Sequence, residues 1–302
     1  MTEPVPTLSI FIVCYNAVRY LADCLNAVRE RVTLPYEVIL LDNGSTDNTS
    51  DFIRQCYPWV KLLRSQENIG FIRGNNLAAK QARGKYYLLL NSDTILLTDL
   101  VSAIKLLEGK NQIGVVGAKM YGEQNQVRPS AGRFPRALRL WRFGSLWVNP
   151  EEQHDNNGQI FPVDWVEGSF LMTTAENWNS VGGLDESNFL YGDDIDFCRS
   201  TLERGLITVQ CATTKYIHFG GFEPSRTGYL FAGYRHYHQK FSSRAERLLA
   251  DVVLRVGLFG RVFVYGVRYL ISREPSIGEK ARSFAKLQRQ WHQTASFAPR
   301  FE

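Results

Sequence analysis

The stretch YEVILLDNGSTD at residues 36–47 decides the fold that we expect, because it joins a short apolar run to a polar turn. The run from Tyr36 to Leu41 is typical of a buried parallel strand, and Asp42 follows where such a strand ends. Similar runs occur at 8–14, 60–64 and 86–90, and the residues between them, 20–31, 51–56 and 74–82, have helical patterns. This alternation predicts a doubly wound α/β sheet that binds a nucleotide.

Beyond residue 100 the pattern is less regular. Residues 128–158 are rich in Pro, Arg, Trp and Asn and have no clear period, so we expect long loops over the sheet edge. A strand at 163–173, helices at 175–181 and up to 205, a last strand at 207–218 and an apolar helix at 244–271 follow. We therefore expect one α/β domain at 1–240 and a basic helical tail at 241–302.

The composition excludes several protein classes. Hydrophobic residues make up 44% and charged residues 22% of the chain, which is ordinary for a globular protein, and nothing repeats at a fixed period. The five scattered cysteines form no C-x-x-C pair, which predicts buried reduced thiols. The N-terminus lacks the basic and long apolar regions of a secretory signal, so we expect a cytoplasmic protein.

Positive charge is concentrated in the tail. Residues 241–302 contain 11 Lys or Arg and 5 Asp or Glu, a net charge of +6, whereas the preceding residues contain 24 and 25, a net charge of −1. Four charged residues interrupt the apolar helix, and central charges are costly in a bilayer, so we expect no transmembrane span. These residues, Asp251, Arg255, Arg261 and Arg268, occupy an arc of roughly 140° on a helix, as in a helix that lies in the membrane interface.

The tail has two interpretations. It could bind an anionic membrane surface, which would make the protein peripheral at the inner face of the plasma membrane. Alternatively, the helix packs on the α/β domain and its arginines extend into solvent. Nucleic acid is not an expected partner, because the tail matches no common nucleic-acid-binding module.

Polar side chains follow three of the expected strands, and ligands bind beyond the carboxyl ends of strands in open α/β sheets. An aromatic ring at the first end can pack on a nucleobase, and a carboxylate at the second can accept hydrogen bonds from a base or ribose. The chain has no G-x-G-x-x-G after the first strand and no P-loop, which disfavours dinucleotide oxidoreductases and P-loop NTPases. The three ends are Tyr15-Asn16, Asp42-Asn43-Gly44-Ser45 and Asn91-Ser92-Asp93.

Two further features suggest a metal and a base. Asp93 could hold a divalent cation that neutralises phosphates, although a turn or helix cap would also place a carboxylate there. Asp193, Asp194 and Asp196 form an acidic cluster that repels itself unless a cation, an arginine or solvent stabilises it. One of them is a candidate general base, and a helix N-terminus is the structural alternative. His218 follows the last strand and could complete a metal site.

The ordered motifs resemble the GT-A glycosyltransferases of family 2, and within them the bacterial rhamnosyltransferase-like branch. The likeness covers about residues 7–240. It implies a GT-A fold, a Rossmann-like mixed sheet flanked by helices, with a nucleotide-sugar-binding half at about 1–125, an acceptor-binding half at about 126–240 and a C-terminal helical extension. The motifs are SIFIVCYN (9–16), VILLDNGSTD (38–47), ENIGF (67–71), GNN (74–76), LNSD (90–93), WVEGSF (165–170), GGLDE (182–186), YGDDID (191–196) and HFGG (218–221).

The resemblance also implies roles for single residues. Asp93 would bind Mg²⁺ or Mn²⁺ with His218 as an extra ligand, and Asp194 would be the general base. The family has a D-x-D motif with two carboxylates, and in this chain Asn91 replaces the first of them. The Glu-Asp pair of the family is Asp193-Asp194 here, so either of these two residues could be the base. The donor-binding residues would be Tyr15, Asn16, Asp42, Asn43, Asn68, Gly70, Asn75, Asn91, Ser92 and Gly168.

The implied activity is inverting transfer of a sugar, with L-rhamnose from dTDP-rhamnose favoured, to a glycan or lipid-linked glycan acceptor in surface polysaccharide biosynthesis. A UDP-hexose or UDP-N-acetylhexosamine donor is the alternative. A non-catalytic scaffold in a polysaccharide-assembly complex is a third hypothesis, which the missing first carboxylate favours slightly. The acceptor site could include Arg133, Phe134, Trp141, Trp147 and the loop around His154.

Overall fold

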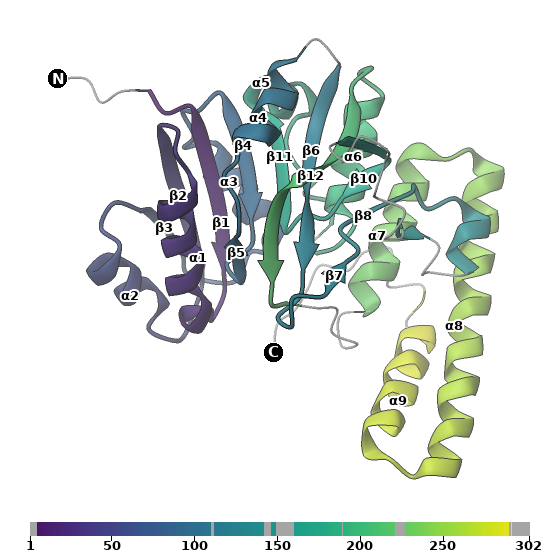
Figure 1. Ribbon diagram of the computed structural model, residues 1–302. Coiled ribbons are helices and arrows are strands. Elements are labelled where there is room, and N and C mark those ends of the chain that lie inside the picture. The colour runs from purple at the N-terminus through teal and green to yellow at the C-terminus, as the bar shows by residue number, and fades with distance from the viewer. Residues whose placement is uncertain are drawn as a thin grey trace. The chain divides into compact units, whose positions relative to one another are not determined.

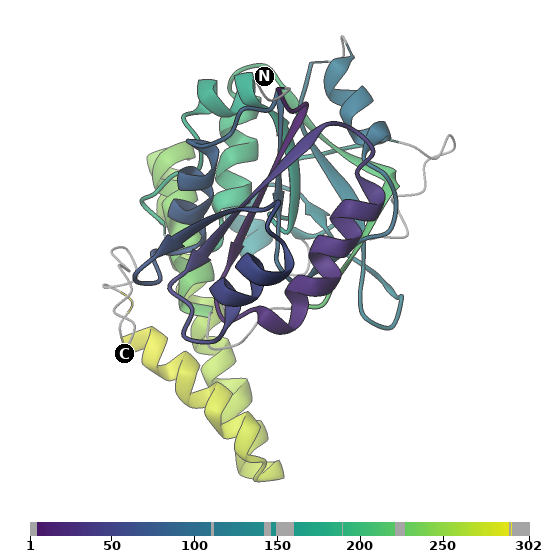
Figure 2. The same ribbon diagram turned by 90° about the vertical axis from the view of Figure 1, so that its left-hand side faces the viewer.

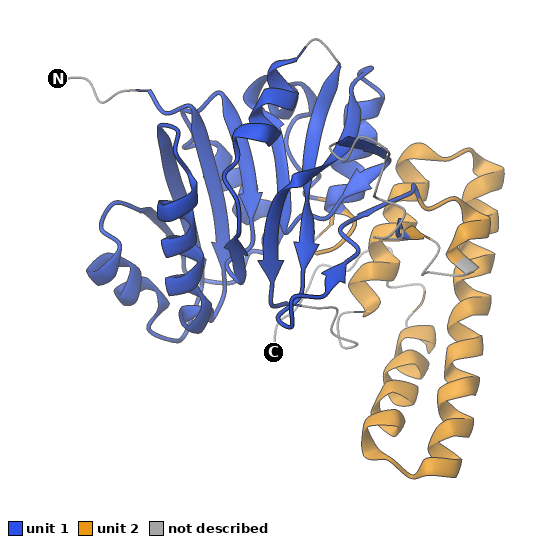
Figure 3. Cartoon of the chain, viewed as in Figure 1, with its two compact units in different colours: residues 1–134, 147–186, 193–220 blue, residues 135–146, 187–192, 221–302 orange. Residues whose placement is uncertain are grey.

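A computed structural model describes residues 5–109, 112–141, 146–148, 160–188, 190–220, 227–289 and 291 of the chain. The chain divides into two compact units (Figure 3). The first unit comprises Met1–Phe134, Trp147–Glu186 and Asp193–Gly220, and the second comprises Pro135–Leu146, Ser187–Gly192 and Gly221–Glu302. The second unit thus takes in two short segments that precede the expected tail, and the boundary at residue 240 with its two functional halves stays a prediction.

The first unit is built on one mixed sheet with the strand order β3-β2-β1-β4-β11-β6-β12-β5 (Figure 1). Strands β1 to β4 are parallel to their neighbours in this group, β11 is antiparallel to both β4 and β6, and β12 is parallel to β6. The bounds are β1 Leu8–Cys14, β2 Tyr36–Asn43, β3 Lys61–Ser65, β4 Tyr86–Leu90, β5 Thr94–Leu96, β6 Ile113–Tyr121, β11 Phe170–Thr174 and β12 Ile207–His218. The predicted α/β class with a mixed sheet is confirmed.

The order of the strands determines where a ligand can bind. The chain runs outward from β1 to β3 through α1 (Val18–Arg31) and α2 (Thr49–Cys56), and then returns through α3 (Phe71–Ala79) to β4 on the other side of β1. The order therefore reverses between β1 and β4. In open α/β sheets the crevice for a ligand lies at such a reversal, beyond the carboxyl ends of the strands. The polar residues that follow β1 and β4 flank this point.

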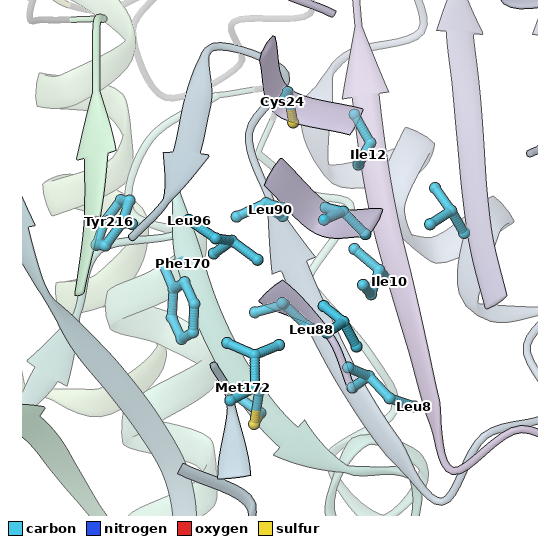
Figure 4. Packing of buried hydrophobic residues seen from close by; sticks show 14 of the residues in the cluster. Leu8, Ile10, Ile12, Cys24, Leu88, Leu90, Leu96, Phe170, Met172 and Tyr216 are labelled. Carbon is cyan, nitrogen blue, oxygen red and sulfur yellow. The ribbon is translucent and has the colours of Figure 1, made fainter. Parts of the chain in front are cut away.

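Alternating side chains of β1 pack on the two faces of the sheet. On one face Leu8, Ile10 and Ile12 pack with Leu88 and Leu90 of β4 under α1 and α4 (Val101–Glu108), in a cluster whose upper edge in Figure 4 is Cys24. On the other face the ring of Phe11 lies 4.9 Å from Tyr87 and 6.1 Å from Trp178 of α5 (Ala175–Val181). Burial on both faces explains why the strands read as continuous apolar runs.

Most of the expected elements are present, with differences at their ends. The strands at 8–14, 86–90 and 207–218 and the helix at 175–181 have the predicted bounds. Helix α3 begins at Phe71 rather than 74, directly after Gly70, whose φ of 89° ends the preceding extended segment. Helix α4 and strands β5 and β6 belong to a stretch for which no element was predicted.

The predicted strand at 163–173 is wrong as a single element. It consists of β9 (Ile160–Val163), β10 (Trp165–Val166) and β11. The pieces have different partners, because β9 pairs with β12, β10 with β8 (Ala131–Gly132), and β11 with β4 and β6. The chain turns at Glu167, whose carbonyl accepts a hydrogen bond from the Phe170 N–H at 3.1 Å. This turn presents Glu167 and Gly168 at the end of the sheet.

The expected long loops at 128–158 contain short elements in their described part. Strand β7 (Val127–Arg128) pairs with β6, β8 pairs with β10, and η1 (Ala137–Trp141) is a 3₁₀ helix. The loop around His154 lies outside the described residues. Four of the five free cysteines are buried as expected, whereas Cys56 at the end of α2 is exposed.

The second unit is helical, as the predicted C-terminal extension requires. Helices α7 (Thr227–Phe241), α8 (Arg244–Ser272) and α9 (Pro275–Arg289) follow one another, and α8 and α9 lie side by side in both views (Figures 1 and 2). The ring of Phe284 stacks on Tyr265 at 5.5 Å, and the Glu246 carboxylate accepts a hydrogen bond from the Ala137 N–H of η1. Among the described residues, no helix is long and apolar enough to cross a membrane.

Candidate active site

The loops after β1 and β2 are joined by side-chain hydrogen bonds. The Asn16 side-chain oxygen accepts a hydrogen bond from the Thr46 N–H, and the Asn16 N–H donates to the Ser45 hydroxyl, both at 2.9 Å. Asp42 is buried and accepts hydrogen bonds from the Ser45 N–H and the Ser50 hydroxyl. Asp42 therefore holds the loop that follows its own strand, in addition to any contact with a ligand.

A second network fixes the loop that precedes α3. The Asn43 amide donates to the Asn68 side-chain oxygen at 2.9 Å, and its own oxygen accepts from the Ile69 N–H at 2.9 Å. Asn68 in turn accepts from the Gly70 N–H at 3.0 Å. Gly44, at a φ of 78°, lets the two loops meet, because a Cβ there would lie 2.6 Å from the Glu67 carbonyl carbon. Asn43, Asn68 and Gly70 thus shape the loop that starts α3.

Three further predicted donor-binding residues differ in their surroundings. Tyr15 is 49% exposed, so its ring is available to a ligand. Asn75 is buried in α3 with its amide bonded to the Phe71 carbonyl, and its side-chain oxygen accepts no hydrogen bond from the described residues. Ser92 is half-buried in the turn between β4 and β5. The roles of these residues toward a donor stay predictions.

Asp93 and His218 lie together, as the sequence predicts. The Asp93 Oδ1 atom lies 3.3 Å from His218 Nε2, since Asp93 precedes β5, which pairs with the end of β12 at His218. The Phe219 N–H donates to the Asp93 carbonyl at 3.0 Å, which holds the two chain segments together. A carboxylate oxygen and an imidazole nitrogen therefore lie side by side; carboxylates are ligands for Mg²⁺ and Mn²⁺, and imidazoles are ligands for transition-metal cations.

Two observations support the fit of these residues to a cation. Gly220 leaves room beside both candidate ligands, because a Cβ there would lie 2.4 Å from Asp93 Oδ2 and 2.8 Å from His218 Nε2. The buried side-chain oxygen of Asn91 accepts no hydrogen bond from the described residues, and the Asn91 amide nitrogen lies 3.4 Å from His218 Nε2. Asn91 thus places a neutral amide beside His218, where the related motif has a carboxylate.

Sequence reasoning missed the role of Glu167, which was noted only as part of a motif. Its Oε1 atom lies 3.5 Å from His218 Nδ1, on the side of the ring opposite Asp93. Burial alone lowers the pKa of His218, but the hydrogen bonding and charge of Asp93 and Glu167 outweigh burial and raise this pKa to about 9. The sequence signal that could have identified Glu167 is its position directly before a glycine at the end of an expected strand.

Arg128 was also missed. Its guanidinium donates to the carbonyls of His218 at 3.1 Å and Gly220 at 2.7 Å, and so holds the backbone on both sides of Phe219. No local pattern marks Arg128, because its partners lie about 90 residues further along the chain.

The acidic cluster begins helix α6 (Asp193–Leu202), and all three carboxylates lie in its first turn. The helix macrodipole therefore favours them, as the structural alternative proposed. Asp194 nevertheless makes a tertiary contact, because its Oδ2 accepts from the Gly168 N–H at 3.1 Å while its Oδ1 accepts from the Ile195 N–H at 2.8 Å. Asp193 Oδ2 would lie 3.6 Å from a Cβ at Gly168, an ordinary van der Waals distance, so the two carboxylates lie directly beside this turn.

Burial and mutual repulsion keep protons on this pair to an unusually high pH. Burial raises the pKa of Asp193 to about 6, and the negative charge of Asp196 adds to the effect. Burial, followed by the charge of Asp193, raises the pKa of Asp194 well above its ordinary value. Carboxylates with raised pKa values are typical of general acid and base sites. Both residues have the required chemistry, and only Asp194 is hydrogen-bonded to the Gly168 turn.

Some of the predicted acceptor residues also cluster. The rings of Trp147 and Trp165 lie 4.7 Å apart, Arg133 pairs with Asp164 at 3.6 Å, and the Arg199 guanidinium lies 5.4 Å from the centre of the Phe134 ring. Trp147 is 38% exposed and could stack on a sugar.

The chain as a whole is similar to known proteins. The family model described as glycosyl transferase family 2 matches residues 9–161, about half of the chain. The chain belongs to glycosyl transferase family 2. It is therefore a glycosyltransferase, as predicted, and the bacterial rhamnosyltransferase-like branch is supported by a relative from Mycobacterium tuberculosis. This protein, N-acetylglucosaminyl-diphospho-decaprenol L-rhamnosyltransferase, is 25% identical over 240 residues, which cover 72% of this chain and 76% of the relative.

Solved structures confirm that this glycosyltransferase has the GT-A fold. The mannosyltransferase PcManGT from Pyrobaculum calidifontis, in complex with GDP-Man and Mn²⁺, superposes with a TM-score of 0.61 and 14% identity over 98% of this chain and 89% of that chain. GalNAc-T7 with UDP, GalNAc and Mn²⁺ superposes with a TM-score of 0.63 and 14% identity over 98% of this chain. The match spans only 59% of the GalNAc-T7 chain.

Proposed function

We propose that this glycosyltransferase transfers a sugar from a nucleoside diphosphate-sugar to an acceptor hydroxyl with inversion. The sugar that we propose is L-rhamnose, with dTDP-rhamnose as the donor. One observation carries the catalytic part of the proposal. Two consecutive residues, Glu167 and Gly168, contact both candidate clusters, since Glu167 lies against His218 and the Gly168 N–H binds Asp194. A single turn thus connects the predicted metal ligands with the predicted base.

The chain's own residues would divide the reaction as follows. Asp194 accepts the proton of the acceptor hydroxyl while that oxygen attacks the anomeric carbon and the bond to the nucleoside diphosphate breaks. Its hydrogen bonds from Gly168 and Ile195 hold the carboxylate in place, and each carboxylate oxygen keeps a further lone pair for the proton. Attack opposite the leaving group in one displacement gives inversion.

Asp93 and His218 would hold Mg²⁺ or Mn²⁺, with Asn91 and Ser92 beside them. A bound divalent cation stabilises the negative charge on the departing diphosphate as a Lewis acid. Glu167 would keep the His218 ring oriented by accepting from Nδ1, in the manner of carboxylates behind metal-binding histidines.

The donor would lie between the loops that the two hydrogen-bond networks shape. Tyr15, Asn16 and Asp42 would hold the nucleoside. The loop with Asn43, Asn68 and Gly70 would direct the N-terminus of α3 and Asn75 toward the donor. Gly168 would leave room for the sugar between the two clusters.

The identity of the donor has two candidates, and the relatives support one each. The mycobacterial relative supports rhamnose and a polyprenyl-diphosphate glycan acceptor, whereas the structural neighbours contain UDP or GDP-Man. A UDP-hexose or UDP-N-acetylhexosamine donor is therefore the second candidate. The non-catalytic scaffold is disfavoured, because the chain contains Asp93, Asp194 and His218 together.

A donor panel tests the proposal directly. Purified protein would be incubated with dTDP-rhamnose, UDP-glucose, UDP-N-acetylglucosamine or GDP-mannose, a lipid-diphosphate glycan acceptor and Mn²⁺ or Mg²⁺, and the product's anomeric configuration would be read by NMR. We expect turnover with dTDP-rhamnose, an inverted product and no turnover with a metal chelator. A retained configuration would refute the mechanism, and turnover with a UDP-sugar alone would replace the donor and leave the mechanism intact.

A further inference from the structure

Helix α8 of the second unit has a long apolar face that the described residues of this unit leave uncovered. Ten large apolar side chains between residues 248 and 271 are between 40% and 79% exposed. Together they present on the order of 1,000 Å² of apolar surface, whereas the largest patch on a typical soluble monomer is roughly 300–600 Å². They are Leu248, Leu249, Val252, Val256, Phe259, Phe263, Val264, Val267, Leu270 and Ile271, and we name them the α8 apolar face.

The α8 apolar face is continuous and uncharged. At 100° per residue its ten side chains span an arc of roughly 160°, and no Asp, Glu, Lys or Arg between residues 248 and 271 falls within that arc. The opposite side of the helix is used for packing, since Ala250, Leu254 and Leu258 are buried and Tyr265 stacks on Phe284 of α9. The α8 apolar face therefore lies opposite the side of the helix that packs in the core of the unit.

The charges around this face indicate its partner. Residues 244–289 contain ten Lys or Arg and four Asp or Glu, a net charge of +6. Exposed arginines lie beyond both ends and along an edge of the face, at Arg244, Arg247, Arg268 and Arg273, and none of the residues from 252 to 272 is acidic. Apolar side chains on one face with cations at its edges are typical of a helix that lies in the plane of an anionic bilayer.

A second copy of the chain is the competing occupant, and area alone does not exclude it. A stable protein interface needs roughly 800 Å² from each partner, which this face provides. Self-association through α8 would, however, bring two basic helical pairs of charge +6 together, whereas an anionic surface neutralises the same charge. Charge complementarity therefore favours the bilayer.

We propose that the α8 apolar face inserts into the headgroup region of an anionic membrane, with α8 parallel to the bilayer plane. The helix has 29 residues and is about 43 Å long, and it does not cross the membrane. This surface would bring the enzyme to the membrane independently of the sugar that it transfers.

Flotation with vesicles tests the proposal on the full chain. We expect the wild type to float with vesicles of phosphatidylglycerol and phosphatidylcholine. With vesicles of phosphatidylcholine alone, it should remain in the bottom fraction of the gradient. Phe259→Asp combined with Phe263→Asp should lower the partition coefficient at least tenfold, since two central apolar side chains become anionic. Arg268→Gln should lower it about fivefold, the effect of one cation near an anionic surface.

The matched control is Leu138→Asp, because Leu138 in η1 is 76% exposed and does not belong to the α8 apolar face. It should change partitioning less than twofold. Phe263→Ser provides a variant without added charge, and unfolding midpoints of all variants should match the wild type because Phe259 and Phe263 are 61% and 65% exposed.

Three outcomes would overturn the proposal. The wild type could fail to float with anionic vesicles, or the Phe259/Phe263 variant could float as well as the wild type. Alternatively, the wild type could be a dimer in lipid-free buffer that Phe263→Asp converts to a monomer, which would assign the face to a second copy. Transfer to a water-soluble acceptor, measured in parallel, separates these outcomes from a failure of the proposed enzymatic activity, because it needs no membrane.

Discussion

At the scale of single residues, the turn at Glu167 and Gly168 contacts both parts of the candidate active site. Glu167 faces a candidate metal ligand, and the next residue donates a backbone hydrogen bond to the candidate base. A Cβ at Gly168 would lie 3.6 to 3.8 Å from Asp193, Asp194 and the Phe71 ring, so this turn lies next to both carboxylates. Burial, together with the charge of neighbouring carboxylates, raises the pKa values of Asp193 and Asp194, which links the chemistry of the site to its stability.

Replacing Asp194 should remove turnover and leave donor binding in place. We expect Asp194→Asn to lower kcat at least about 1,000-fold, because an amide cannot accept the acceptor's proton, with the donor dissociation constant changed less than about threefold. The matched control is Asp51→Asn, a first-turn aspartate of α2 whose side chain is 69% exposed, and it should retain the wild-type rate. Full turnover by Asp194→Asn would move the base to Asp193.

The pH dependence follows from the raised pKa values. Since a base acts only when deprotonated, kcat/KM should fall as the pH drops through the raised pKa of the Asp193–Asp194 pair, with Asp193 at about 6. The unfolded chain loses these protons at a lower pH, so the pair destabilises the fold above that range and Asp194→Asn should raise the unfolding midpoint at pH 8 more than at pH 5. A midpoint difference independent of pH would contradict the assigned shift.

Replacing Asp93 tests the cation site separately from the base. Asp93→Ala should abolish the extra thermal stabilisation that Mn²⁺ adds to nucleoside diphosphate binding, since it removes the anionic ligand. The stabilisation by the nucleotide without metal should persist. Asp99→Ala replaces an exposed aspartate that follows β5 and serves as the control; it loses a hydrogen bond to the Val101 N–H, but the extra stabilisation by Mn²⁺ should equal that of the wild type. An unchanged Mn²⁺ effect in Asp93→Ala would exclude Asp93 as a ligand.

At the scale of elements, the loop after β2 is held against the loop before α3 by a close backbone approach. Gly44 combines a φ of 78° with a close neighbour, since a Cβ there would lie 2.6 Å from the Glu67 carbonyl carbon. Gly205 has nearly the same φ, 79°, and a Cβ there would have nothing within 4 Å. Alanine substitutions at the two glycines can therefore separate two free-energy costs, that of the positive φ, which both share, and that of the steric overlap, which occurs only at Gly44.

We expect Gly44→Ala to destabilise the fold more than Gly205→Ala. The φ alone should cost about 1–2 kcal/mol in either variant, and the displacement of the Glu67 backbone should add about 1–3 kcal/mol at Gly44. Gly44→Ala should also raise the donor KM, because the shifted loop carries Asn68 and Gly70. Urea unfolding and steady-state kinetics measure both effects. Equal destabilisation in the two variants would show that the loops separate without cost.

At the scale of the whole molecule, the proposed membrane surface and the proposed acceptor make a joint prediction. With a lipid-linked acceptor presented in anionic vesicles, Phe259→Asp/Phe263→Asp should raise the acceptor KM at least tenfold, because the enzyme no longer concentrates at the surface. The donor KM and the rate with a water-soluble acceptor should not change. A loss of activity with both acceptors would indicate damage to the catalytic unit instead.

The sequence by itself determined most of the nucleotide-binding framework. Apolar runs from Leu8 and Tyr86 located β1 and β4 to the residue, because buried parallel strands need continuous apolar sequence. The polar residues at their ends located Asp93, and with the order of the motifs they led to the family. These are local properties, and a single chain segment is sufficient to show them.

Only the tertiary structure decided what connects those residues. Asp93 meets His218 because β5 pairs with the end of β12, a contact across 125 positions that no local pattern specifies. Glu167 takes part because the predicted strand at 163–173 changes partners and turns there, and Arg128 takes part because the fold brings the His218 carbonyl, 90 positions further along the chain, within hydrogen-bond distance. The exposed side of α8 was equally undetermined, since periodicity places apolar residues on a helix face and only packing shows which face remains uncovered.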